Sequence, residues 1–167
     1  MRDLTVDLLN HLFEYDKETG NLIWKIQNQG ARKGNIAGTL RPDGYYQIAI
    51  NKKLYLTHRL VFLMHKGYLP EILDHINNDA GDNRIENLRA ASRSQNAYNS
   101  KLASNNKSGY KGVFWLKENK KWRASITFNK KAIHLGCFDN VEEAAEVVRK
   151  AREELHGDFA HHGDDND

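Results

Sequence analysis

The sequence predicts an α+β protein made of two small domains. Residues 1–100 mix short strand patterns with short helical patterns, and residues 109–160 hold three strand patterns followed by one helix pattern. The polar stretch 101–108 has no apolar periodicity, which is typical of a linker. We expect residues 161–167 to form a disordered tail.

The composition is that of a soluble globular chain. Its 167 residues are 40% hydrophobic and 28% charged, with a formal net charge of +3. The single cysteine, Cys137, excludes a disulfide framework and a cysteine-based zinc site, and it fits a reducing cytoplasm. The apolar runs are too short to cross a membrane, and the N-terminus lacks the apolar core of a signal peptide. We therefore expect a cytoplasmic protein without a membrane partner.

Positive charge is concentrated in one region of the chain. Between residues 101 and 131 nine basic residues face a single acid, Glu118. Such a local basic region indicates nucleic acid more strongly than the small net charge does. The basic residues are Lys101, Lys107, Lys111, Lys117, Lys120, Lys121, Arg123, Lys130 and Lys131.

The N-terminal region predicts two helices and several strands. Thr5 is a helix cap, and apolar residues at helical spacing predict a helix over 5–14. Further elements are strands over 22–24, 46–50 and 54–57 and a helix over 58–66 that ends at Gly67. In this second helix, His58, Arg59 and His65 are open to two interpretations, catalysis or polar positions on a buried bracing helix. For His65 we favour the second.

The stretch from Asp74 to Asn96 holds the candidate chemistry. It predicts a strand, a turn-rich loop, a short strand, and a helix that starts with a capping box from Ser92 to Gln95. Mg²⁺ prefers oxygen ligands and usually takes one or two protein groups plus water and phosphate. The Asp74 carboxylate and the Asn96 amide oxygen are therefore candidate ligands for Mg²⁺ or Mn²⁺.

His75 is the candidate general base. Neighbours on an extended segment point to opposite faces, so His75 can meet a water on one side of a phosphate while the metal lies on the other. A neutral imidazole can take a proton from that water. The stretch therefore predicts hydrolysis of a phosphodiester. The structural alternatives are an ordinary His–Asp pair, and for Asn96 a helix-start residue.

This stretch resembles the HNH (ββα-metal) endonucleases, especially the homing type from phages. The resemblance rests on Asp74-His75-Ile76-Asn77-Asn78-Asp79, on Asp82 to Arg89, and on Ser94-Gln95-Asn96, within a ββα core at about 70–100. It implies that His75 is the base, that Asn87 holds the base and hairpin in place, and that Asp74 and Asn96 bind the metal. Many members carry histidine where this chain has Asn96. An HR pair like His58-Arg59 is common there, which places Arg59 near DNA.

Residues 109–160 predict a three-stranded antiparallel sheet packed on one helix. The strands are expected over 109–115, 122–128 and 133–138, and the helix over 141–155 with Asn140 or Asp139 as its cap. In the middle strand, Trp122, Ala124 and Ile126 alternate with Arg123, Ser125 and Thr127. We expect Trp115 and Trp122 to be core residues.

This second region resembles the plant Apetala-type, or ethylene-response-factor (ERF), DNA-binding domain. The resemblance rests on Tyr110-Lys111-Gly112-Val113, Trp122-Arg123-Ala124, Leu135-Gly136-Cys137-Phe138-Asp139, Glu142-Glu143-Ala144-Ala145 and His156-Gly157. It implies that the exposed sheet face enters the major groove of DNA. The residues carried over to that face are Lys111, Phe114, Arg123, Ser125, Thr127 and His134. Several plant arginines and a tryptophan are replaced here, so the plant target sequence does not transfer.

Together these patterns predict a metal-dependent endonuclease that cuts double-stranded DNA at preferred sites. The resemblance implies a homing role, phage origin and hence the cytoplasm of a bacterial host, and products with 5′-phosphate and 3′-hydroxyl ends. One site per chain nicks one strand, so a double-strand break needs a second copy or a second event. A non-catalytic DNA-binding regulator and an RNA-directed nuclease are the alternatives.

Overall fold

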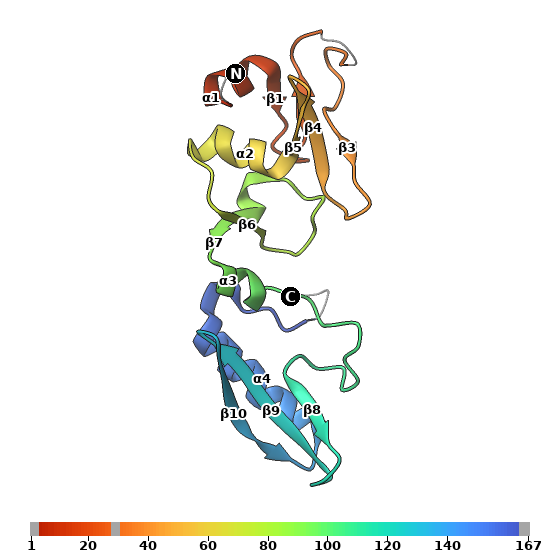
Figure 1. The fold of residues 1–167 in the computed structure, drawn as a ribbon, viewed down its shortest axis with the longest axis vertical. Coiled ribbons are helices and arrows are strands. Elements are labelled where there is room, and N and C mark those ends of the chain that lie inside the picture. The colour runs from red at the N-terminus through yellow and green to blue at the C-terminus, as the bar shows by residue number, and fades with distance from the viewer. Residues whose placement is uncertain (1–3, 28–30, 164–167) are drawn as a thin grey trace. The chain divides into compact units, whose positions relative to one another are not determined.

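The computed structural model describes residues 4–27 and 31–163. The chain divides into two compact units, Met1–Ala90 and Ala91–Asp167. Both units combine small antiparallel sheets with helices, which confirms the α+β class (Figure 1). Among the described helices, none is long and apolar enough to cross a membrane.

The first unit begins with a helix that feeds directly into a strand. Helix α1 (Val6–Leu12) starts at the predicted cap, because the Thr5 hydroxyl accepts a hydrogen bond from Leu8 N at 3.2 Å. The predicted helix over 5–14 ends early. Residues Phe13–Tyr15 instead form β1, which pairs antiparallel with β2 (Leu22–Trp24), so pairing between strands replaces the last helical turn.

A three-stranded antiparallel sheet follows, with the order β3-β4-β5. Its strands are β3 (Thr39–Leu40), β4 (Tyr46–Ile50) and β5 (Lys53–Leu56). The β4–β5 hairpin turns at Asn51 and Lys52, which both have positive φ (50° and 65°), as a tight two-residue hairpin turn requires. One face of β4 is buried through Ile48 and Ile50.

Helix α2 (Thr57–Lys66) provides the centre of the first core. Leu60 and Val61 are fully buried, and they belong to one apolar cluster with Leu9, Phe13 and other residues of α1 and the sheets. The helix ends at Gly67, in the left-handed conformation (φ 76°), as predicted. Figure 1 shows α1 next to α2 in this unit, and the two helices are in contact.

The stretch with the candidate chemistry follows α2. Strand β6 (Ile72–His75) pairs with β7 (Leu88–Ala91), and the 3₁₀ helix η1 (Ile85–Asn87) lies between them. Helix α3 (Arg93–Tyr98) starts with the predicted capping box. The expected first domain extends to residue 100, whereas the structure groups α3 with the second unit, where Tyr98 stacks on His156 at 3.8 Å between ring centroids.

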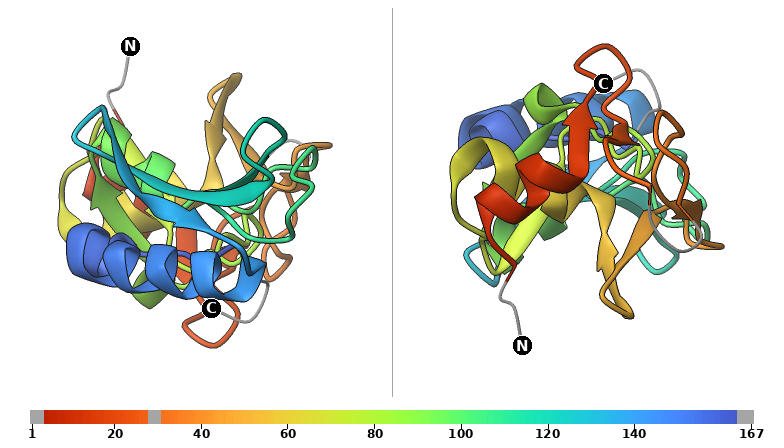
Figure 2. Two further views of the ribbon diagram at one scale, coloured as in Figure 1. Left: turned by 90° about the horizontal axis from the view of Figure 1, so that it is seen from below. Right: turned by 90° about the horizontal axis from the view of Figure 1, so that it is seen from above.

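The second unit contains an antiparallel sheet of order β10-β9-β8 covered by one helix. The strands are β8 (Val113–Leu116), β9 (Lys121–Phe128) and β10 (Lys131–Phe138), and α4 (Val141–His156) lies along one face (Figure 2, left). Its core consists of Val113, Ala124, Ala144 and Val148. Asn140 caps α4, as predicted.

Two expectations for this unit are corrected. The first strand starts at Val113 rather than residue 109, because Gly109 and Gly112 have positive φ. The predicted tail is ordered over its first residues, after the 3₁₀ helix η2 (Gly157–Phe159). His161 is buried, and its carbonyl oxygen accepts a hydrogen bond from Lys111 Nζ. Residues 164–167 of that expected tail lie outside the described part.

Candidate active site

Strand β6 places Asp74 and His75 at its end, and both side chains are buried. Their exposed fractions are 6% and 5%. A buried carboxylate beside a buried imidazole is unusual, because burying polar groups costs free energy unless partners compensate. The Asp74 carboxylate and the His75 imidazole therefore lie inside the first unit, beside its core, on a strand whose backbone is paired with β7.

Arg89 compensates the charge of Asp74. From the neighbouring strand β7, Arg89 donates from Nε to Asp74 Oδ2 at 2.8 Å. The side chains are 16% and 7% exposed, so little water screens the pair. This ion pair keeps a carboxylate charge in the interior, and no local sequence signal assigns a role to Arg89.

The His75 imidazole is neutral at neutral pH. Burial lowers the pKa of His75 below its usual 6.5, while the side chain of Asn83 and the Asp74 charge act in the opposite direction. A neutral ring has a lone pair available for a proton. The electrostatic surroundings therefore suit the predicted role of general base.

Asn83 contacts this site although the sequence indicated only a turn residue. It is 1% exposed, and its Nδ2 donates to Gly81 O at 3.2 Å. No local sequence signal distinguishes it from the neighbouring turn formers, Asn77, Asn78, Asp79 and Asp82. Only the burial of the loop against the body of the unit sets it apart.

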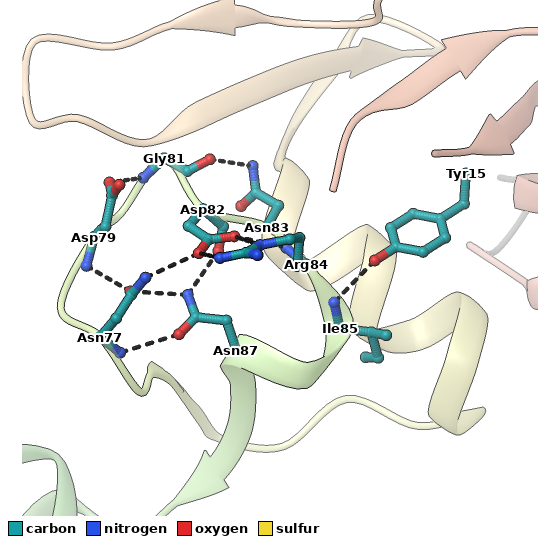
Figure 3. Close-up of polar contacts among 9 residues, drawn as sticks. All are labelled: Tyr15, Asn77, Asp79, Gly81, Asp82, Asn83, Arg84, Ile85 and Asn87. Carbon is teal, nitrogen blue, oxygen red and sulfur yellow. Dashed lines mark hydrogen bonds and ion pairs between the residues drawn. The ribbon is translucent and has the colours of Figure 1, made fainter. Parts of the chain in front are cut away.

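Asn87 braces the loop that follows His75. Its Oδ1 accepts from Asn77 N at 3.0 Å, and its Nδ2 donates to Asn77 Oδ1 and to Asp82 O, both at 2.9 Å (Figure 3). In addition, Ile76 N donates to the Asn87 carbonyl oxygen at 2.9 Å. Asn87 thus ties both ends of the loop together, which is the geometry expected of a residue that holds the hairpin in place.

The loop is further fixed by an ion pair and by the N-terminal hairpin. Arg84 donates through Nε and Nη2 to the two carboxylate oxygens of Asp82, which lowers the pKa of Asp82 (Figure 3). Ile85 N donates to the Tyr15 hydroxyl at 2.9 Å. Gly20 lies so close that a Cβ there would be 2.4 Å from Arg84 N. The β1–β2 hairpin therefore supports the loop from one side.

A second histidine packs against His75. His58, near the start of α2, is 4% exposed, and its ring lies 5.0 Å from the His75 ring at 66°, in an edge-to-face arrangement. Tyr45 lies against both rings, at 5.2 Å from His58 and 5.7 Å from His75. Burial lowers the pKa of His58 to about 3, and the charges of His75 and Arg59 add to this. The sequence left the role of His58 open.

The remaining N-terminal candidates have simpler surroundings. Arg59 donates from Nη2 to Pro70 O at 3.0 Å, so its guanidinium anchors the segment that leads into β6. His65 is exposed, and its Nδ1 lies 2.8 Å from Val61 O, in agreement with a structural role. Asn96 lies on α3, in the second unit, and its role as a metal ligand stays a prediction.

The donor set of the first unit fits a hard divalent cation. Among the described residues there is no group of three or more His, Cys, Asp or Glu side chains that could hold a metal. A cysteine- or histidine-rich site is therefore not present in that part. One buried carboxylate, Asp74, is the kind of single protein ligand that Mg²⁺ uses together with water and phosphate oxygens.

Four of the predicted DNA-contacting residues are cross-strand partners in the second unit. Phe114 on β8 lies opposite Arg123 on β9, and Ser125 on β9 lies opposite His134 on β10. Phe114, Arg123 and His134 are exposed. Thr127 is exposed too and shares the strand and face of Arg123 and Ser125. These five residues therefore form one face of the sheet, opposite to the buried Val113 and Ala124.

Lys111 is the exception in this set. Its Nζ donates to the carbonyl oxygens of Tyr98, Ser100 and His161. Three acceptors use all the hydrogens of an ammonium group, so the Lys111 amine joins the segments around residues 98–100 and 161 and is not displayed on the sheet face with the other five residues. Trp115 also differs from expectation, because it is 46% exposed rather than a core residue.

Comparison with known proteins decides the family. A family model described as HNH endonuclease matches residues 55–98, which run from the end of β5 to α3. The chain is 38% identical over 95 residues to "Protein 3.8" of Escherichia phage T7, and the match covers 57% of this chain and 75% of that protein. The chain belongs to the HNH endonuclease family. The matched region contains Asp74, His75, Asn87 and Asn96 of this HNH endonuclease.

A second relative supports the assignment. An "Uncharacterized HNH endonuclease" of Acanthamoeba polyphaga mimivirus is 33% identical over 106 residues, covering 62% of this chain and 54% of that protein. No solved structure matches the chain. The HNH endonuclease is thus an enzyme, a nuclease of a generally metal-dependent family with relatives in phages and viruses.

Proposed function

We propose that this HNH endonuclease hydrolyses phosphodiester bonds in double-stranded DNA with the help of one Mg²⁺ or Mn²⁺ ion. The observation that carries the proposal is a neutral, buried His75 directly beside a carboxylate, Asp74, whose charge is held by Arg89 at 2.8 Å. One group can accept a proton while the adjacent one binds a cation. Both tasks promote hydrolysis of a phosphodiester near neutral pH.

In this mechanism the residues of the chain orient and deprotonate a water molecule. The His75 imidazole accepts a proton from the water, whose oxygen forms a bond to phosphorus. The bond from phosphorus to the 3′ oxygen breaks and that oxygen takes up a proton from solvent water, which leaves a 5′-phosphate and a 3′-hydroxyl. Asp74 would hold the metal, with Asn96 as the second proposed ligand, and the metal would supply charge stabilisation at the phosphate. Asn87 holds the loop beside the base through its bonds to Asn77 and Asp82.

The second unit would supply binding to DNA. Its sheet face with Phe114, Arg123, Ser125, Thr127 and His134 resembles the DNA-reading face of ERF-type domains, and the surrounding region carries an excess of cations. The cations attract phosphates, and side chains at base edges give sequence preference. This division of labour would give an enzyme that nicks preferred sites, as a phage homing endonuclease does.

A supercoiled-plasmid assay tests the proposal. The full chain is incubated with Mg²⁺, with EDTA, and as His75→Ala. We expect open-circle product with Mg²⁺, none with EDTA, and none with the variant, which should still bind DNA. Direct linearisation would indicate two active sites acting together. Absence of cleavage with Mg²⁺ and Mn²⁺ despite tight binding would overturn the proposal. Faster cleavage of a structured RNA would favour the RNA-directed alternative.

A further inference from the structure

We infer that His58 is a positioning residue for this endonuclease, because its ring holds the His75 imidazole in the orientation in which it accepts the proton from water. The inference rests on the proposed role of His75 as base. It assigns a part in the reaction to the start of α2, a different element, in which His58 lies 17 positions before His75 in the sequence. The contact between the two rings, 5.0 Å apart and at 66°, carries the argument.

The three-ring cluster restricts how His75 can turn. An imidazole on a strand end has two side-chain torsions that must be fixed for one nitrogen to meet a reacting water. His58 contacts the ring from α2, and Tyr45, half-buried, contacts both rings from the segment between β3 and β4. Two segments of the first unit, α2 and the connection between β3 and β4, thus enclose the His75 ring.

The chemical nature of His58 makes it a poor choice for packing alone. Only 4% of the surface of His58 is exposed, and its Nδ1 has no hydrogen-bond partner within the described part of the chain. A buried polar atom without a partner carries a desolvation cost that a phenylalanine ring of similar size would avoid. A residue retained at such a cost next to a candidate base points to a contribution to the site.

The charge state of His58 is consistent with this role. Desolvation keeps its ring neutral, with a pKa of about 3, and its place in the first turn of α2 also disfavours a positive charge. A neutral neighbour does not repel the proton that His75 has to accept. His58 can therefore enclose the base by contact without making it a weaker base.

The test compares four full-length proteins in single-turnover nicking of supercoiled plasmid: wild type, His58→Ala, His58→Phe and His65→Ala. His65 is the matched control, since it lies on the same helix and its ring packs edge-to-face on Tyr15 at 4.4 Å, away from His75. We expect His58→Ala to lower kcat about 10- to 100-fold at unchanged KM, and His58→Phe to keep most of the rate because the ring contact remains. His65→Ala should match wild type. Thermal unfolding of each variant verifies that it is folded.

Two results would overturn the inference while leaving the nuclease intact. One is a His58→Ala enzyme with wild-type kcat. The other is an equal loss in His58→Phe and His58→Ala, since the hydrogen-bonding atom and not the ring would then matter. A readout independent of cleavage completes the test. NMR of the wild-type protein should give a cross-peak between the two imidazole rings, and His75 ring signals should show greater mobility in His58→Ala. Unchanged mobility would contradict positioning even if no DNA were cut. If the wild-type protein itself does not cut DNA, that result counts against the proposed function instead.

Discussion

Arg89 neutralises Asp74 inside the first unit, through a 2.8 Å contact between strands β7 and β6. Removing one partner of a buried ion pair leaves the other charge buried and uncompensated. We expect Arg89→Ala to lower the free energy of unfolding by about 3–5 kcal/mol, measured by urea denaturation. Arg41→Ala is the matched control. Its pair with Asp43 has the same 2.8 Å separation but is exposed, and its loss should have no measurable effect. Equal effects of the two substitutions would show that burial is not what makes the Arg89 pair matter.

The effects of substituting Asn87 and Asn77 on the nicking rate should be coupled. Asn87→Ala removes three side-chain hydrogen bonds from the loop, and we expect the nicking rate to fall about 10- to 100-fold. Asn77→Ala removes one of the same bonds, from Asn87 Nδ2 to Asn77 Oδ1, because the other bond between the two residues uses the backbone N–H of Asn77. A double-mutant cycle measured by kcat should therefore give a combined loss smaller than the sum of the two single losses. Strictly additive losses would mean that the two residues act separately.

The stability of the protein should fall in acid because of His58. Its pKa is about 3 in the folded protein and 6.5 when unfolded, so the unfolded chain binds the extra proton first as the pH falls. The stabilising effect of a neutral His58 is complete above pH 6.5 and is lost as the pH falls from 6.5 towards 3. His58→Phe lacks this group. The stability advantage of His58→Phe over wild type should grow as pH decreases, by up to about 1.4 kcal/mol for each pH unit. A constant difference between pH 7 and pH 4 in urea titrations would contradict the folded-state pKa.

Substitutions of Lys111 and Arg123 should have different effects in the second unit, on stability for Lys111 and on DNA binding for Arg123. Arg123 is exposed on the sheet face, and we expect Arg123→Ala to weaken binding to duplex DNA. If Arg123 contacts a phosphate, the slope of log K against log[salt] should become shallower by about one. Lys111→Ala removes a lysine from the same basic region, but its amine bonds to three carbonyl oxygens. That variant should lower the thermal unfolding temperature and leave the salt slope unchanged. Anisotropy titrations at several salt concentrations measure both.

Gly20 should be needed to place the loop beside His75. Gly20→Ala adds a Cβ 2.4 Å from Arg84 N, at a φ of 74° that side chains rarely adopt. Gly34→Ala has a similar φ of 85° but no neighbouring atom within 4 Å, so it reports the cost of the conformation alone. We expect Gly20→Ala to be clearly less stable than Gly34→Ala and to nick DNA more slowly. Similar unfolding temperatures would show that the hairpin can move away without consequence.

Local signals were well predicted from the sequence. The Thr5 cap, the Ser92–Gln95 capping box and the Gly67 helix end each depend on residues within one turn of the chain, and the structure has all three. The Asp74-His75 pair and Asn87 were predicted because the family motif keeps them close in sequence, and their catalytic roles stay predictions.

Contacts made by folding were not predicted. His58 and Asn83 reach His75 only because α2 and the loop pack against β6, and Arg89 reaches Asp74 only across a strand pair. The loss of the last turn of α1 has the same origin, since Phe13 to Tyr15 are helical by local pattern but gain partners in β2. Lys111 was placed on the DNA face by resemblance, and only the neighbouring carbonyl groups reveal its other use.

The hydrogen bond from Ile85 N to the Tyr15 hydroxyl joins residues 70 positions apart, and this separation has a consequence for synthesis. At about 5–20 residues per second, a ribosome needs roughly 4–14 s to pass from one to the other. During that time the hairpin with Tyr15 is already made, and the loop that it supports does not yet exist. A chain that stalls before residue 85 therefore carries the supporting hairpin without Ile85 and Asn87, and it lacks the hydrogen bonds that hold the loop beside His75.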